Sequence, residues 1–230
     1  LQALDVNSED LYKSRSTRYE VIDQILSDLE LAIAKLPPEQ EIPGQEKGKV
    51  SKWAAMAFKA RVLLYEATWE KYVGEATDWE AGQMPSGKDE RVNSYLDEAA
   101  QLAKTVMDEG PYELFHHTAL GDQSSYFLFV LEDELSNPAG LTKADNHEYI
   151  FQHNFDFNLG RVHTTNITHQ GKGNLSPNRK MMDMFLCTDG LPPTKSSVFQ
   201  GYDSIHHEYQ NRDNRLYCWV KVPGNNYWGN

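Results

Sequence analysis

Three segments in the first half of the chain repeat apolar residues at three- and four-residue steps, which predicts helices. The first runs from about Tyr19 to Leu36, and Thr17 with Glu20 forms a capping-box signature at its start. An alanine-rich segment from about Ser51 to Tyr72 is the second, and about Tyr95 to Glu109 is the third. Because alanines recur at helical spacing in the second and third segments, we expect these two helices to pack closely as an antiparallel hairpin.

The pattern becomes irregular after Pro111. Apolar and polar residues alternate over Glu148 to Phe157 and again over Leu216 to Val222, which predicts two short strands. Between them, Asn178 to Leu186 has the pattern of a short amphipathic helix. Two further assignments are a helix or turn over Tyr126 to Leu135 and a surface loop, carrying Trp79, over Thr77 to Arg91.

These elements predict a mainly α fold with two parts. Residues 1–115 would form a scaffold of tetratricopeptide-like helix pairs. Residues 116–230 would form a loop-rich, ligand-binding half with short strands, incomplete at its C-terminus. The chain starts without methionine and closes on Tyr227-Trp228-Gly229-Asn230, so we expect it to be part of a longer protein.

Composition narrows the function without naming it. The 230 residues carry a formal net charge of −12, which argues against nucleic acid as the main partner because phosphate binding needs a basic face. No apolar run approaches the ~18 residues that a membrane-spanning helix needs. The acidity fits a neutral or cationic ligand, but it also serves solubility.

The candidate chemistry is sparse. Cys187 and Cys218 are too few for a disulfide framework or a zinc site, and either two free thiols or one disulfide fits the sequence. The eight histidines match no metal-binding spacing, and His206-His207-Glu208 has the pattern of a solvated surface run. The carboxylates, such as Glu132, lie on predicted exposed helix faces and no nucleophile elbow occurs. We therefore expect no metal, no cofactor and no enzyme.

Aromatic residues are the more informative set. Several lie in predicted loops, near element ends or on the polar face of a strand, namely Trp69, Trp79, Tyr217, Trp219, Tyr227 and Trp228. Flat rings with flanking amides and carboxylates bind the apolar C–H faces of sugars, but aromatics also complete the core of a loop-rich half. Both interpretations stay open for each residue.

Several separated motifs then occur in an order that resembles the SusD/RagB family. They are Tyr19–Ala32 followed by Leu36-Pro37, the alanine-rich helix, Tyr95–Phe115, Glu148–Phe151, Leu175–Gly190 with its Asp189-Gly190 pair, and Asn211–Leu216. In the last of these, Asn214 stands where the family's motif has proline. The resemblance covers nearly all of this chain and the middle of a typical member.

The resemblance implies a protein anchored by an N-terminal lipid, absent from this chain, on the outer surface of the outer membrane. Such proteins bind oligosaccharides or polysaccharides, cover a SusC-like TonB-dependent transporter and do no chemistry. The family's ligand residues vary, so the candidates rest on residue type and predicted loop position; they are Trp228, Tyr227, Trp219, Trp69 and His163. The alternative is a tetratricopeptide-type module that binds other proteins, and a glycan hydrolase is a third possibility that we do not expect.

Overall fold

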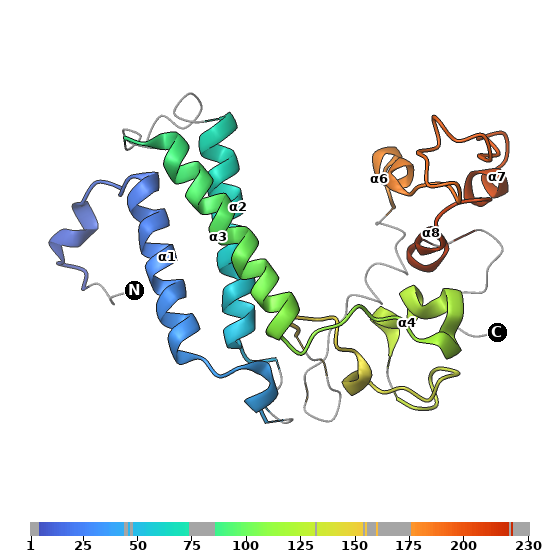
Figure 1. Ribbon diagram of the computed structural model, residues 1–230, viewed down its shortest axis with the longest axis horizontal. Coiled ribbons are helices and arrows are strands. Elements are labelled where there is room, and N and C mark those ends of the chain that lie inside the picture. The colour runs from blue at the N-terminus through green and yellow to red at the C-terminus, as the bar shows by residue number, and fades with distance from the viewer. Residues whose placement is uncertain are drawn as a thin grey trace. The chain divides into compact units, whose positions relative to one another are not determined.

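The computed structural model forms two compact units, which are described separately (Figure 1). It describes residues 5–43, 46, 48–73, 86–131, 133–153, 155, 160, 176–220 and 222. Unit 1 comprises Leu1–Tyr112 and Tyr149–His153, and unit 2 comprises Glu113–Glu148 and Asn154–Asn230. The described residues are mainly helical, as predicted. The division into a scaffold and a ligand-binding half stays a prediction.

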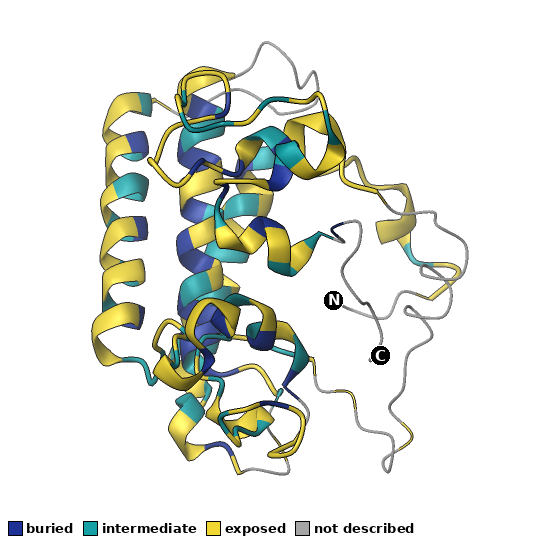
Figure 2. Cartoon of the chain, turned by 90° about the vertical axis from the view of Figure 1, so that its right-hand side faces the viewer, coloured by how far each residue is buried: buried dark blue, intermediate teal, exposed yellow. Residues whose placement is uncertain are grey.

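Unit 1 is built on α1 (Arg18–Lys35), α2 (Lys52–Tyr72) and α3 (Lys88–Glu109). Two short 3-10 helices, η1 (Glu9–Tyr12) and η2 (Glu39–Glu41), flank α1 in the chain. Helix α2 packs against both α1 and α3, and it runs antiparallel to α3 (Figure 1). Most of the buried helical positions of unit 1 lie on α2, which is the central helix of the unit (Figure 2).

Local side chains set where these helices begin. The predicted capping box at the start of α1 is present, because Thr17 accepts from the amide of Glu20 while Glu20 accepts from that of Thr17. Ser51 caps α2 by accepting from the amide of Ala54. Helix α3 starts well before the predicted position, after Gly87, whose φ of 75° places it in the left-handed region. The predicted loop is therefore wrong over residues 88–91, and residues 77–85, with Trp79, lie outside the described residues.

The core of unit 1 centres on Trp53, Met56 and Val106. The indole of Trp53 donates a hydrogen bond to Gln40 at 2.9 Å. Ile150 packs against this cluster, and the hydroxyl of Tyr112 lies 3.4 Å from its carbonyl oxygen. The described residues of the predicted strand at 148–157 form no strand, since no described segment pairs with them, and residues 149–153 belong to unit 1.

The described part of unit 2 consists of short helices joined by turns. They are η5 (Thr118–Gln123), α4 (Ser124–Val130), η6 (Lys143–Asp145), α6 (Arg179–Met184), α7 (Ile205–Tyr209) and α8 (Asn214–Trp219). Helix α6 confirms the amphipathic segment predicted there, and α4 confirms the helix at the start of the segment from Tyr126. Helix α8 shows that the predicted strand over Leu216–Val222 is wrong, because Asp213 caps a helix there by accepting from the amide of Arg215.

Two of the motif segments meet in unit 2. The Thr188 amide donates to the carbonyl of Asn211 at 2.9 Å, and the Asp213 amide donates to that of Leu186 at 2.8 Å. Between them, Arg212 is 3% exposed, and its guanidinium donates to three backbone carbonyls, those of Met182, Phe185 and Glu208. These motif residues therefore hold the backbone of unit 2 together.

The described cysteines and helices settle two smaller points. Cys187 and Cys218 are both free, the first buried and the second partly exposed. Among the described residues, no helix has the length and apolar character needed to cross a membrane.

Candidate functional site

An exposed pair of aromatic rings lies where α4 packs against α8 in unit 2. Trp219 is 44% exposed and Phe129 is 60% exposed, and their ring centroids are 5.8 Å apart in an edge-to-face arrangement. The ring of Phe185 also packs edge-to-face with Trp219, with the ring centroids 6.1 Å apart. The indole N–H donates to the carbonyl of Ser125 at 3.2 Å, which fixes the orientation of the ring. We call Trp219 and Phe129 the aromatic pair.

The sequence exposes these rings because the helices that carry them are short. Helix α4 has seven residues and places Tyr126, Phe127 and Phe129 within less than two turns. Phe127 is buried in the cluster with Leu120 and Leu131, so Phe129 is left on the outside. On α8, Leu216 is fully buried, and Trp219 lies one turn further on, at the edge of the core.

Charges beside the aromatic pair are neutralised. The guanidinium of Arg215 lies 5.8 Å from the centroid of the Trp219 ring. Its Nε atom donates to both carboxylate oxygens of Asp213, at 3.0 and 3.1 Å. The hydrogen bond from Arg215 is the largest influence on Asp213 and lowers the pKa of that carboxyl. The site thus offers flat apolar rings beside polar groups whose charges cancel.

The site has no feature of catalysis among the described residues. Burial raises the pKa of the Cys218 thiol, which keeps it in the protonated, weakly nucleophilic form. No group of three described His, Cys, Asp or Glu side chains is placed to hold a metal ion. What the arrangement offers a ligand is contact with ring faces and hydrogen bonds.

The structure separates the residues predicted for the site. Trp219 is on the aromatic pair, whereas Trp69 lies on α2 in unit 1, where the guanidinium of Arg18 stacks 3.9 Å from its ring centroid. One face of the Trp69 ring is therefore used within the protein. His163, Tyr227 and Trp228 lie outside the described residues.

Sequence reasoning missed Phe129. The available signal was three aromatics within four positions of one short apolar run, more than a short helix can bury on one side. The apolar run was assigned to a helix or turn, and its aromatics were not considered as surface residues.

Comparison with known families identifies the class of protein. A SusD-like family model, described as "Starch-binding associating with outer membrane", matches residues 3–64, and the SusD family model matches residues 130–230. The two matched regions contain most of the described motif segments in the same order along the chain. The chain belongs to the SusD/RagB family. No curated protein and no solved structure matches it.

Family membership gives the general function. SusD/RagB proteins are glycan-binding proteins of the outer membrane that act in nutrient uptake, and they are binding proteins rather than enzymes. They are surface lipoproteins and work with SusC-like transporters. Of the aromatic pair, Trp219 lies within the region that the SusD family model matches. Phe129 is the residue immediately before that region.

Proposed function

We propose that this chain is the glycan-binding subunit of an uptake system and that it delivers oligosaccharides to a TonB-dependent outer-membrane transporter. The observation that carries the proposal is the aromatic pair, two exposed rings held in place by a hydrogen bond and by packing. The two rings are exposed side by side, and an apolar patch of adjacent rings supports a binding site where a single exposed ring would not. Family membership supports a glycan as that ligand.

Each part of the proposed site has a distinct role. The Trp219 ring is the platform for the C–H face of a sugar, and Phe129 forms an edge-on wall beside it. Asp213 and Arg215 supply an acceptor and donors for sugar hydroxyls at the rim. His163, Tyr227 and Trp228 are proposed as further ligand contacts from the same half of the chain.

The proposed location follows from the family. We place the protein on the outer surface of the outer membrane, held there by an N-terminal lipid. Its partner in uptake is the SusC-like transporter. No catalytic step is proposed, so the bound glycan is passed on unchanged.

Affinity electrophoresis through gels that contain single polysaccharides tests the proposal. We expect retardation by at least one neutral polysaccharide and a loss of about tenfold or more in affinity for Trp219→Ala. Phe129→Ala is the second variant, because Phe129 is 60% exposed and its truncation leaves the fold intact. Tyr72→Ala is the matched control, since Tyr72 is an exposed aromatic of unit 1 that is 74% exposed.

Two outcomes contradict the proposed function. One is a folded protein, by circular dichroism, that no polysaccharide retards. The other is retardation that Trp219→Ala and Phe129→Ala leave unchanged, which would move the site away from the aromatic pair.

Protein docking through the helical scaffold is a second candidate function. The observation that favours it is the acidic face of α1 and α3, on which a pocket opens. This role is compatible with glycan binding, because it uses unit 1 and the aromatic pair belongs to unit 2.

A further inference from the structure

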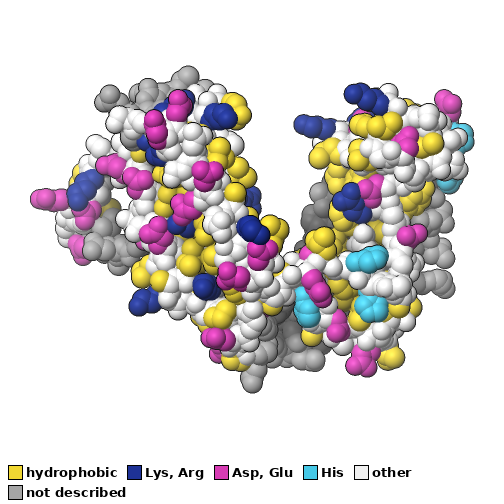
Figure 3. All heavy atoms as spheres, viewed as in Figure 1, with side chains coloured by type: hydrophobic (Ala, Val, Ile, Leu, Met, Phe, Trp, Pro, Cys, Tyr) yellow, Lys and Arg dark blue, Asp and Glu magenta, His cyan; other side chains and the backbone are white. Residues whose placement is uncertain are grey.

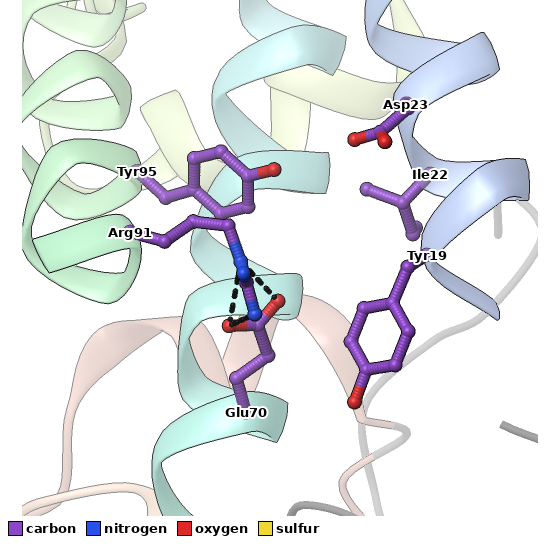
Figure 4. Close-up of a pocket in the computed structure, with 6 residues that line it drawn as sticks. All are labelled: Tyr19, Ile22, Asp23, Glu70, Arg91 and Tyr95. Carbon is purple, nitrogen blue, oxygen red and sulfur yellow. Dashed lines mark hydrogen bonds and ion pairs between the residues drawn. The ribbon is translucent and has the colours of Figure 1, made fainter. Parts of the chain in front are cut away.

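Unit 1 contains a pocket of about 180 Å³ that all three long helices line (Figure 4). Helix α1 contributes Tyr19, Ile22 and Asp23, α2 contributes Glu70, and α3 contributes Arg91 and Tyr95. Pockets for drug-sized ligands span about 300–1,000 Å³, so this one suits a single small group. It is therefore too small for an oligosaccharide.

The floor of the pocket is a closed ion pair. Glu70 is 1% exposed, and the Arg91 guanidinium donates to both of its carboxylate oxygens at 2.7–3.1 Å. Desolvation lowers the pKa of Arg91, but the hydrogen bonds and charge of Glu70 raise it by more, so the guanidinium stays protonated. A ligand therefore meets a rigid floor whose two charges are already matched.

The mouth of the pocket carries a carboxylate that has no such match. Asp23 is exposed and forms no ion pair within the part of the chain that the structure describes. The hydroxyl of Tyr95 points toward it from the opposite wall (Figure 4). Burial raises the pKa of the Tyr95 phenol, and the charges of Asp23 and Glu70 raise it further, as expected in a region of negative potential.

The walls are apolar and aromatic. Ile22 lines one side together with the ring of Tyr19, and the ring of Tyr95 lines the other (Figure 4). The Tyr19 ring already faces the Arg91 guanidinium, 5.6 Å from its centroid, so the groups open to a ligand are the Asp23 carboxylate, the Tyr95 side chain opposite it and Ile22. An unmatched carboxylate beside an apolar wall favours a cation on an apolar stem, because the carboxylate pairs with the charge and the wall packs the stem.

Helices α1 and α3, which form two walls of the pocket, both carry several carboxylates. Exposed or half-buried carboxylates occur along both helices, namely Glu20, Asp23, Asp28 and Glu30 on α1 and Asp89, Glu90, Asp97 and Glu98 on α3. Figure 3 shows acidic side chains spread over unit 1, with basic side chains between them. The cations between the helices are already engaged, since Arg18 binds Glu66, Lys59 binds Glu30 and Glu98, and Arg91 binds Glu70.

We propose that this pocket receives the guanidinium or ammonium group of an arginine or lysine side chain from a partner protein that docks on the face of α1 and α3. The cation would pair with Asp23, approach the Tyr95 hydroxyl and lay its alkyl stem against Ile22. Charge complementarity over the surrounding acidic face supports a protein segment as the source. A single carboxylate at an open mouth is one anchor within a larger interface rather than a complete site for a free metabolite.

Nuclear magnetic resonance of the Ile22 methyl group gives a direct test. The probes are the peptide acetyl-Gly-Arg-Gly-amide, its citrulline analogue, which has the same shape without the charge, and agmatine as a free alkyl guanidinium. We expect a saturable shift with the arginine peptide and with agmatine, and none with the citrulline peptide. Asp23→Asn should weaken the binding of the arginine peptide by about two- to fivefold, as the loss of one exposed ion pair does.

Matched variants separate a local contact from the general field. Asp97→Asn removes the same charge from an exposed position of α3 that does not line the pocket, and it should leave the affinity unchanged. Tyr95→Phe removes the hydroxyl that faces Asp23 and should weaken binding by a smaller factor. Both Asp variants should keep the retardation by polysaccharides, so this inference and the proposed function fail separately.

Three results would overturn the inference. The first is no saturable shift with the arginine peptide, and the second is equal affinity in Asp23→Asn and the unaltered protein. The third is binding of agmatine while the arginine peptide is excluded, which would assign the pocket to a free small cation.

Discussion

At the scale of single residues, the least expected side chains are the charges inside unit 1. Glu66 and Glu70 are each 1% exposed on α2, and Lys59 is 4% exposed. Each meets an opposite charge from a neighbouring helix, with Arg18 bonded to Glu66 at 2.7–3.1 Å. Desolvation lowers the pKa of Arg18, whereas the hydrogen bonds and charge of Glu66 raise it by more. These pairs fix which residues of α1 and α3 lie opposite which residues of α2.

Removal of one partner should be costly. Glu66→Gln leaves the Arg18 guanidinium without its carboxylate, and we expect a loss of about 3 kcal/mol in the free energy of unfolding, the lower end of the range for a broken buried pair. The lower end applies because the Arg18 side chain is still 20% exposed. Urea denaturation followed by circular dichroism measures the change.

A surface pair provides the comparison. Lys104 and Asp108 lie one turn apart on α3 and are both more than half exposed. Lys104→Ala should cost only about 0.3–0.5 kcal/mol, because water and salt screen such a pair. Equal losses in the free energy of unfolding for Glu66→Gln and Lys104→Ala would show that the Arg18–Glu66 pair is not buried in solution.

At the scale of elements, the start of α1 depends on the reciprocal bonds of Thr17 and Glu20. Thr17→Ala removes the side-chain cap and should lower the free energy of unfolding by about 1 kcal/mol, whereas Thr17→Ser should retain it. The hydrogen bond from the Thr17 amide lowers the pKa of the Glu20 carboxyl below its usual value, and the hydrogen bond from the Thr17 hydroxyl lowers it by a smaller amount. Thr17→Ala should therefore also move that pKa upward, which carbon-detected titration of Glu20 measures.

The sign of the pH dependence follows from that direction. A carboxyl whose pKa is lowered by folding stabilises the folded state above its unfolded pKa of about 4.3 and loses this contribution as the pH falls through its folded pKa. Amide exchange in the first turn of α1 should thus accelerate, relative to Glu20→Gln, as the pH is lowered below about 4. An identical pH profile in the two proteins would contradict the capping box as a stabilising element.

The same elements show how far the sequence predicts the fold. Helices α1 and α2 were predicted within one residue at their starts, because Thr17 and Ser51 precede long apolar repeats. The start of α3 was missed, since residues 88–94 are almost all polar and a left-handed Gly87, rather than a side-chain cap, precedes them. The helical period of 3.6 residues can be recognised in a sequence only where apolar residues recur at that spacing.

The two strand predictions failed for a different reason. Alternation over a few residues records which side chains are apolar, but a strand also needs a partner to pair with. Over Leu216–Trp219 the stronger signal was Asp213 at the cap, followed by Asn214 at the first helical position, where the family's motif has proline. Asn214 also donates a hydrogen bond to the carbonyl of Asp122, which ties α8 to the turn before α4.

The candidate site was predicted in part. Trp219 was named from its residue type, although its assigned strand is a helix, and Phe129 was missed. The pocket of unit 1 could not be predicted, because Tyr19, Glu70 and Tyr95 come from three helices whose mutual packing the sequence does not state. The sequence did contain one indication of buried ion pairs between these helices. Lys59, Glu66 and Glu70 are charged residues on the otherwise apolar side of α2.

At the scale of the whole molecule, net charge constrains the glycan. The chain carries a formal charge of −12, and the arginines described in unit 2 are all engaged. Arg179 pairs with Glu208, Arg212 binds backbone carbonyls and Arg215 pairs with Asp213. An anionic polysaccharide would be repelled by this net charge and would find these arginines already engaged, so we expect the ligand to be uncharged.

Salt dependence checks this expectation. Neutral polysaccharides should retard the protein equally at about 0.01 M and about 0.3 M salt, because ring contacts and neutral hydrogen bonds are hardly screened. Polysaccharides rich in uronic acid should not retard the protein at about 0.01 M salt. The Debye length there is about 30 Å, so the net negative charge of the protein still repels the anionic polymer. Retardation by a uronic acid polymer that weakens as salt is added would contradict this, since it requires a cationic subsite that outweighs a net charge of −12. The aromatic pair would then be one part of a longer site whose charge is set by other residues, and Arg215→Gln would be the first variant to compare, because Arg215 is the cation nearest to Trp219 among the described residues.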